Sequence, residues 1–93
     1  MTDNKGVRVL TIDDSRTMQG MLRKVLEGAG YDVIQGGDGV EGLEVLQAAN
    51  PPPKAVITDI NMPRMDGFEV IEAVRKLDQY KHLPVIVLTT ESD

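Results

Sequence analysis

Two kinds of hydrophobic pattern alternate along the chain. Four short segments rich in valine and isoleucine are typical of β-strands, and they span residues 7–12, 31–34, 55–60 and 83–88. Between them, apolar residues recur every three or four positions, as they do on one face of a helix. These positions are Met18, Leu22, Val25, Leu26 and Ala29, then Val40, Leu43, Leu46 and Ala49, then Phe68, Ile71, Val74 and Leu77. The pattern predicts the element order β-α-β-α-β-α-β.

Residues that start and stop helices stand at the ends of the helical segments. Asp38 with Glu41, and Asp66 with Glu69, have the spacing of a capping box, in which the first side chain accepts a backbone N–H of the first turn. Gly30 stands where a left-handed residue would end the first helix. A run of three prolines ends the second helix, because proline cannot continue it. The local signals therefore agree with the periodicity.

A chain of 93 residues allows one domain with a small core, so we assign residues 1–93 to a single domain. Strands that are joined by crossover helices pair in parallel, with helices on both faces of the sheet. The sequence therefore predicts an α/β fold with a doubly wound parallel sheet. Such sheets carry their functional groups at the carboxyl ends of the strands.

Composition and charge exclude several classes of function for this segment. Ten Lys and Arg stand against fifteen Asp and Glu, whereas proteins that bind the nucleic-acid backbone are usually basic. The three aromatic residues form no base-stacking platform. The absence of cysteine excludes a disulfide scaffold and a thiolate metal site, and it fits a cytoplasmic location. No apolar run is long enough to span a membrane, and no signal-peptide pattern follows Met1.

Acidic residues follow the first and third predicted strands. The first strand runs into Asp13 and Asp14, and the third carries Asp59 near its end. In a parallel sheet these carboxylates converge at one edge, where their mutual repulsion opposes ionisation of each. Arg16 is the nearest cation in the sequence, and we expect its side chain to point outward. A divalent cation would relieve the repulsion, and Mg²⁺ fits best because it accepts one or two carboxylates plus a carbonyl and keeps its waters.

The acidic edge suggests phosphoryl-transfer chemistry with Asp59 as the nucleophile. A metal ion held there can neutralise the oxygens of an incoming phosphoryl group, and a carboxylate can then form an acyl phosphate. Asp59 is best placed because it stands alone at a strand end with a loop after it. Thr89 or Thr90, after the fourth strand, could donate a hydroxyl to the phosphoryl oxygens.

Simpler roles exist for the same residues. Asp13, Asp14 or Ser15 could cap the first helix and favour its positive end. Asp59 could be an ordinary loop aspartate, and we expect Asp66 to be a helix cap only. Threonine is common in strands, so the two threonines are weak evidence by themselves. We interpret the methionines of the first helix as packing residues and not as a groove for a partner.

Three motifs carry these residues. They are Asp13-Asp14 after the first strand, Asp59-Ile60-Asn61-Met62-Pro63-Arg64-Met65-Asp66-Gly67 after the third, and Leu88-Thr89-Thr90 after the fourth. Together they resemble the receiver domain of bacterial response regulators. The resemblance extends from about Lys5 to the end of the chain. The helix after Ser15 and the turn at residues 37–41 are most similar to the single-domain chemotaxis response regulators.

The resemblance implies a role for each motif residue. Asp59 would accept a phosphoryl group from a phosphohistidine on a sensor histidine kinase. Asp14 and Asp59 would bind Mg²⁺ through their side chains and Asn61 through its backbone carbonyl, whereas Asp13 would act through a metal-bound water. Thr89 would be the switch hydroxyl. The family also implies a flavodoxin-like sheet with strand order 2-1-3-4, and a downstream effector protein such as the flagellar motor switch.

Compared with the family pattern, the sequence lacks the fourth helix, the fifth strand and the fifth helix. The lysine that pairs with the acyl phosphate and an aromatic switch residue are lacking with them. We therefore expect an incomplete receiver domain whose fourth strand is an exposed apolar edge, and such edges recruit another strand. Three situations stay open: a piece of a longer protein, exchange of elements with a second copy in a dimer, or another partner that supplies the missing layer.

Phosphoacceptor signalling is the leading hypothesis, with self-phosphorylation and self-dephosphorylation as its only catalysis. A magnesium-dependent aspartyl phosphatase would share the acyl phosphate. It usually needs a second acid two residues after the nucleophile, however, where this chain has Asn61. Nucleotide binding is disfavoured because the sequence has no glycine-rich phosphate loop after a strand. A receiver fragment that binds metal or pairs with another chain without stable phosphorylation is a further alternative.

Overall fold

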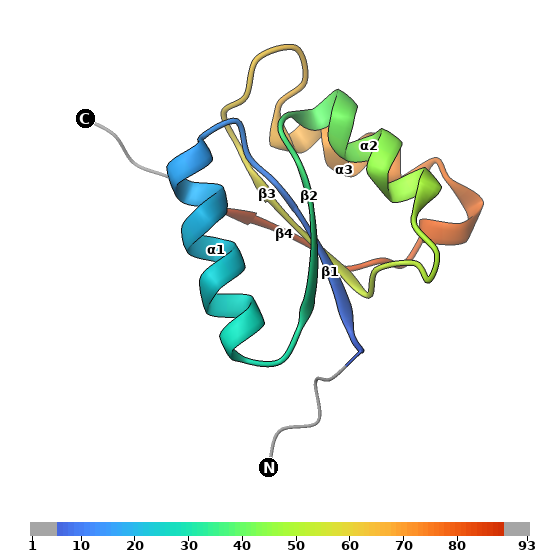
Figure 1. Cartoon of the computed structure of the whole chain (residues 1–93). Coiled ribbons are helices and arrows are strands. Elements are labelled where there is room, and N and C mark those ends of the chain that lie inside the picture. The colour runs from blue at the N-terminus through green and yellow to red at the C-terminus, as the bar shows by residue number, and fades with distance from the viewer. Residues whose placement is uncertain (1–5, 89–93) are drawn as a thin grey trace.

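The computed structural model describes residues 6–88, which form one sheet between two layers of helices (Figure 1). The sheet has four parallel strands in the order β2-β1-β3-β4. The strands are β1 (Arg8–Ile12), β2 (Asp32–Gly36), β3 (Ala55–Asp59) and β4 (Val85–Leu88). The helices are α1 (Arg16–Gly28), α2 (Gly39–Ala48), α3 (Gly67–Arg75) and the short 3₁₀ helix η1 (Asp78–Tyr80). The predicted fold class and strand order are confirmed.

All four strands differ from their predicted bounds at one or both ends, and β1 begins one residue later than predicted, at Arg8. β2 runs to Gly36 because its whole length pairs with β1, with Gly36 opposite Ile12. β3 ends at Asp59, since the next N–H, that of Ile60, donates to the Asp59 side chain. β4 begins after Pro84, which has no N–H to donate to a neighbouring strand.

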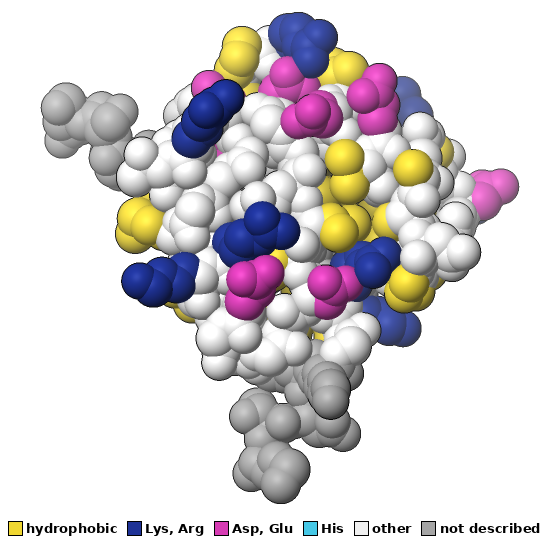
Figure 2. All heavy atoms as spheres, viewed as in Figure 1, with side chains coloured by type: hydrophobic (Ala, Val, Ile, Leu, Met, Phe, Trp, Pro, Cys, Tyr) yellow, Lys and Arg dark blue, Asp and Glu magenta, His cyan; other side chains and the backbone are white. Residues whose placement is uncertain are grey.

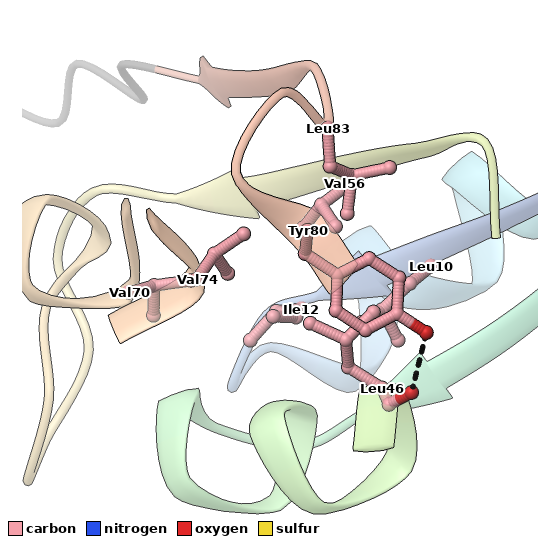
Figure 3. Packing of buried hydrophobic residues seen from close by; sticks show 8 residues of the cluster. All are labelled: Leu10, Ile12, Leu46, Val56, Val70, Val74, Tyr80 and Leu83. Atoms are coloured by element: carbon pink, nitrogen blue, oxygen red, sulfur yellow. Dashed lines mark hydrogen bonds between the residues drawn. The ribbon is translucent and has the colours of Figure 1, made fainter. Parts of the chain in front are cut away.

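The hydrophobic core lies between the sheet and the layer that contains α2 and α3. Eight residues make up its buried cluster: Leu10, Ile12, Leu46, Val56, Val70, Val74, Tyr80 and Leu83. Figure 3 shows the Tyr80 ring packed over Leu46, with the Tyr80 hydroxyl donating to the Leu46 carbonyl at 3.2 Å. The hydrogen bond satisfies the one polar group of a buried aromatic side chain.

The other face of the sheet is covered by α1 and is less closed. No residue of α1 is fully buried, and Val25 is 69% exposed. The interpretation of the methionines as packing residues is wrong for Met21, which is 57% exposed, whereas Met18 is half-buried. Ile86 of β4 is also exposed. Within residues 6–88, these apolar side chains therefore remain open to solvent on the α1 side and at β4.

Aspartate and serine side chains begin the three α-helices. Ser15, Asp38 and Asp66 each accept a backbone N–H in the first turn of their helix. Asp66 and Glu69 form the complete capping box, as predicted. Glu41 instead accepts the N–H of the residue before Asp38, so only half of the other predicted box is present. None of the helices in the described part of the chain combines the length and apolar character needed to cross a membrane.

Candidate functional site

The register of β1 and β3 places acidic residues side by side. Ile12 pairs with Thr58, so the residues that follow them, Asp13 and Asp59, emerge next to one another at the carboxyl edge of the sheet. Asp14 comes next, in the loop before α1. One carboxylate oxygen from each of these three aspartates lies within 4.8 Å of the others. The structure thus brings together the three carboxylates that the sequence predicted to converge.

The three carboxylates differ in burial and in orientation. Asp13 is 2% exposed and Asp59 is 7% exposed, whereas Asp14 is exposed to solvent. Oδ1 of Asp13 accepts the Ser15 N–H at 2.8 Å, and Oδ1 of Asp59 accepts the Ile60 N–H at 2.8 Å. Each buried carboxylate is therefore oriented by the backbone of its own loop.

Burial raises the pKa of Asp13 above its usual value of 3.8. The hydrogen bond from Ser15 lowers that pKa, and the negative charges of Asp59 and Asp14 raise it. The loss of water disfavours the ionised form of Asp13, and the neighbouring like charges add to this effect. Among residues 6–88, no lysine or arginine forms an ion pair with Asp13 or Asp14, and Arg16 is exposed. We call the site formed by Asp13, Asp14 and Asp59 the acidic pocket, and its electrostatics favour a bound cation.

The start of α3 lies directly against the end of β3. The Gly67 N–H donates to the Ile60 carbonyl at 2.9 Å. A Cβ atom at Gly67 would stand 2.7 Å from the carbonyl oxygen of Asp59, closer than a real side chain can approach. Glycine at this position therefore lets the helix pack against the backbone of Asp59.

Gln19 of α1 was not predicted from the sequence as a site residue. Its side-chain nitrogen donates to the Asp13 carbonyl, and also to the Gly36 carbonyl at 2.8 Å. The Gln19 carbonyl in turn accepts the Gln35 side chain at 3.0 Å. One side chain thus ties α1 to the ends of β1 and β2. Its place one helical turn after the Ser15 cap is the signal that could have indicated this role.

The remaining predicted site residues, Asn61, Thr89 and Thr90, follow shortly after strands that end at this edge of the sheet. Asn61 follows in the β3–α3 loop, with an exposed side chain. Leu88, the residue before Thr89, pairs with Asp59. Thr89 and Thr90 themselves lie outside the described residues, so their roles stay predictions. Figure 2 shows acidic side chains gathered at the top of the molecule, where Figure 1 places the β3–α3 loop and the start of α2.

Comparison with known proteins agrees with this geometry. The family model described as "Response regulator receiver domain" matches residues 9–93. The chain belongs to this family. It is 41% identical over 86 residues to the chemotaxis protein CheY1 of Helicobacter pylori, which covers 91% of the chain and 68% of CheY1. It is 42% identical over 82 residues to the sensor histidine kinase CheAY of the same organism, of which it spans only 10%.

Solved receiver structures have the same fold. CheY4 of Vibrio cholerae matches with a TM-score of 0.85 and 42% identity, over 94% of this chain and 71% of that one. The N-terminal domain of a response regulator receiver protein from Methanoculleus marisnigri matches with a TM-score of 0.86 and 34% identity, over 96% and 71% of the two chains. The resemblance to chemotaxis-type receiver domains that the sequence motifs indicated is confirmed.

Proposed function

We propose that residues 1–93 act as a receiver domain in which Asp59 accepts a phosphoryl group, in a magnesium-dependent reaction, and so controls partner binding. The convergence of three carboxylate oxygens within 4.8 Å at the ends of β1 and β3 carries this proposal. Two of the three carboxylates are buried, which is costly unless the site binds a cation. Membership of the receiver family supports the same conclusion.

The donor set fits Mg²⁺ because the cluster of possible ligands consists only of aspartates. Mg²⁺ binds through hard oxygen atoms and retains several waters, whereas zinc in proteins usually takes nitrogen or sulfur ligands. In this proposal the side chains of Asp14 and Asp59 and the carbonyl of Asn61 hold the ion, and Asp13 acts through a metal-bound water. The ion, when bound, neutralises charge on the phosphoryl oxygens.

Asp59 is the proposed nucleophile because it ends a buried strand and its carboxylate is oriented by the Ile60 N–H. A carboxylate oxygen of Asp59 forms a bond to phosphorus while the phosphorus–nitrogen bond of a phosphohistidine breaks and leaves its electron pair on the imidazole. The acyl phosphate carries roughly two negative charges, about one more than the carboxylate it replaces, and it offers new acceptor oxygens. In this proposal the hydroxyl of Thr89 moves toward those oxygens and shifts a pre-existing equilibrium of the nearby surface.

The proposed phosphoryl donor is a sensor histidine kinase, and the proposed output is binding to an effector protein such as the flagellar motor switch. The names of similar proteins support this pairing, since they include a sensor histidine kinase and chemotaxis proteins. We propose a cytoplasmic regulator and not a metabolic enzyme. Asn61 supports this choice, because it occupies the place where an aspartyl phosphatase needs a second acid.

Labelling with acetyl phosphate tests the proposal. We expect the protein to take up one phosphoryl group only when Mg²⁺ is present, and Asp59→Asn to abolish the label. Asp66→Asn is the matched control, because asparagine also caps a helix well and Asp66 lies in the same loop. Label that persists in Asp59→Asn would show that another residue is the nucleophile. Sustained turnover of phosphorylated metabolites would favour the phosphatase hypothesis.

A further inference from the structure

Arg64 has an unusual backbone conformation in the loop between β3 and α3. Among residues 6–88 it is the one non-glycine residue with a positive φ, at 70°. A 2.8 Å hydrogen bond from the Met65 N–H to the Pro63 carbonyl closes a three-residue turn around it. Turns of this kind are rare and strained for a residue with a long side chain. Contacts of the Arg64 side chain are therefore expected to hold the turn in place.

The Arg64 guanidinium reaches the cap of α2. Its Nη2 atom lies 2.5 Å from Oδ2 of Asp38, while Oδ1 of Asp38 accepts the Glu41 N–H at 2.9 Å. One oxygen of Asp38 thus caps α2, while the other binds the β3–α3 loop through Arg64. The Glu41 N–H and the guanidinium hold the pKa of Asp38 below its usual 3.8, so the carboxylate is charged at neutral pH.

A second contact fixes the same loop against α2. Met65 lies on Gly39, where a Cβ atom would stand 2.8 Å from the Met65 Cβ and 3.0 Å from its carbonyl oxygen. The loop closes at the hydrogen bond from the Gly67 N–H to the Ile60 carbonyl. In Figure 1 this loop stands beside the start of α2, as these contacts require. The segment between β3 and α3 is therefore held both at its ends and in its middle.

We propose that Asp38 and Arg64 form a positioning pair that fixes the β3–α3 loop and thereby sets the affinity of the acidic pocket for Mg²⁺. The inference rests on the proposed function above. The loop begins directly after Asp59 and carries Asn61, whose carbonyl is the proposed third oxygen ligand. A shift of the loop would thus displace a ligand while the three acidic side chains stay in place. Neither member of the pair is a metal ligand in this proposal.

Two single substitutions each remove the Asp38–Arg64 ion pair, while one preserves the helix cap and the other preserves the turn. Asp38→Asn removes the charge but keeps a good N-cap. Arg64→Asn removes the guanidinium, and asparagine is among the residues that tolerate the left-handed region. Lys81→Gln is the matched control: it breaks the 3.5 Å pair with Asp78, and the Lys81 side chain is 58% exposed, compared with 60% for Arg64. That pair lies at η1, before β4.

The experiment is a Mg²⁺ titration of each variant without a phosphoryl donor, together with thermal unfolding of the metal-free proteins. We expect Asp38→Asn and Arg64→Asn each to weaken Mg²⁺ binding by about tenfold, the low end for residues that orient metal ligands. The double variant should bind no more weakly than either single variant, and Lys81→Gln should match the wild type. Unfolding midpoints should change little. The rate of labelling by acetyl phosphate should fall at low magnesium and recover at saturating magnesium.

Wild-type affinity in both single variants would overturn the positioning role, and so would additive losses in the double variant. A loss of labelling that saturating magnesium does not restore would overturn it as well. These results differ from a failure of the proposed function, in which the wild-type protein itself would bind no Mg²⁺ or take no label.

Discussion

Two groups of aspartates lie at the carboxyl edge of the sheet, and they differ in the groups that surround their negative charges. Asp38 and Asp66 each begin a helix and accept a backbone N–H at 2.9 Å. Asp13 and Asp59 are buried instead, and they lie with Asp14 among like charges. A carboxylate at a helix start stabilises the fold, whereas carboxylates that crowd together oppose each other's ionisation. The second arrangement is the one expected of a binding site.

The comparison shows why residue type alone does not identify the site. Both groups lie between the carboxyl end of a strand and the start of the next helix, and both consist of aspartate. They differ in whether the side chain turns to its own helix or toward acids from another strand. Register decides this, because the Ile12–Thr58 pairing brings Asp13 beside Asp59.

The largest structural effect is expected at Gly67, where the first residue of α3 meets the backbone of Asp59. Gly67→Ala should lower the free energy of unfolding by about 1–3 kcal/mol, because the added Cβ meets a carbonyl oxygen that cannot rotate away. Chemical denaturation measures the change. Gly20→Ala in α1, where nothing lies within 4 Å, should be neutral or stabilising by up to about 1 kcal/mol. Equal effects of the two substitutions would contradict the close packing at Gly67.

A smaller effect is expected when a cap is removed. Asp66→Ala should cost about 1 kcal/mol of stability, because the backbone N–H of Glu69 loses its acceptor. The loss should be the same with and without magnesium, as measured by denaturation in both conditions. If magnesium stabilised Asp66→Ala less than it stabilises the wild-type protein, Asp66 would be part of the acidic pocket.

The smallest effect is a difference in pH dependence between the two groups. The pKa of Asp13 is raised in the fold, chiefly by burial, so its contribution to stability should fall as pH rises from 3.8 through the raised value. The pKa of Asp38 is lowered, chiefly by the Glu41 N–H, so its contribution should be complete above 3.8 and be lost as pH falls through the lowered value.

Denaturation across the acidic range, without magnesium, separates these two contributions. Asp13→Asn should remove the first dependence, and Asp38→Asn should remove the second. If both substitutions changed the pH dependence of the free energy of unfolding in the same direction, the contrast between the crowded Asp13 and the hydrogen-bonded Asp38 would be contradicted.

Much of the fold could be predicted because its signals are local. Valine-rich runs marked the strands, Asp38 and Asp66 marked helix starts, and Gly30 ends α1 with a φ of 99° as its position suggested. The acidic pocket could be predicted because a parallel topology brings the carboxyl ends of all strands, including β1 and β3, to one edge of the sheet. The roles of Asp13 and Asp59 in phosphoryl transfer stay predictions.

The features that escaped prediction depend on partners far away in the sequence. Arg64 contacts Asp38, which is 26 positions away, and Gln19 contacts Gly36 at a separation of 17. The exposure of Met21 depends likewise on which elements pack beside α1. No periodicity or capping signal encodes such contacts, because they arise only when the helices settle on the sheet.

The dependence of folding stability on magnesium tests the central claim most directly. Mg²⁺ at ten times its dissociation constant should raise the free energy of unfolding by about 1.4 kcal/mol, because the ion binds only where the acids converge. Asp66→Asn should retain this increase, and Asp14→Asn, at an exposed position, should lose most of it. A wild-type protein whose unfolding is indifferent to millimolar magnesium, or an undiminished increase in Asp14→Asn, would contradict the account.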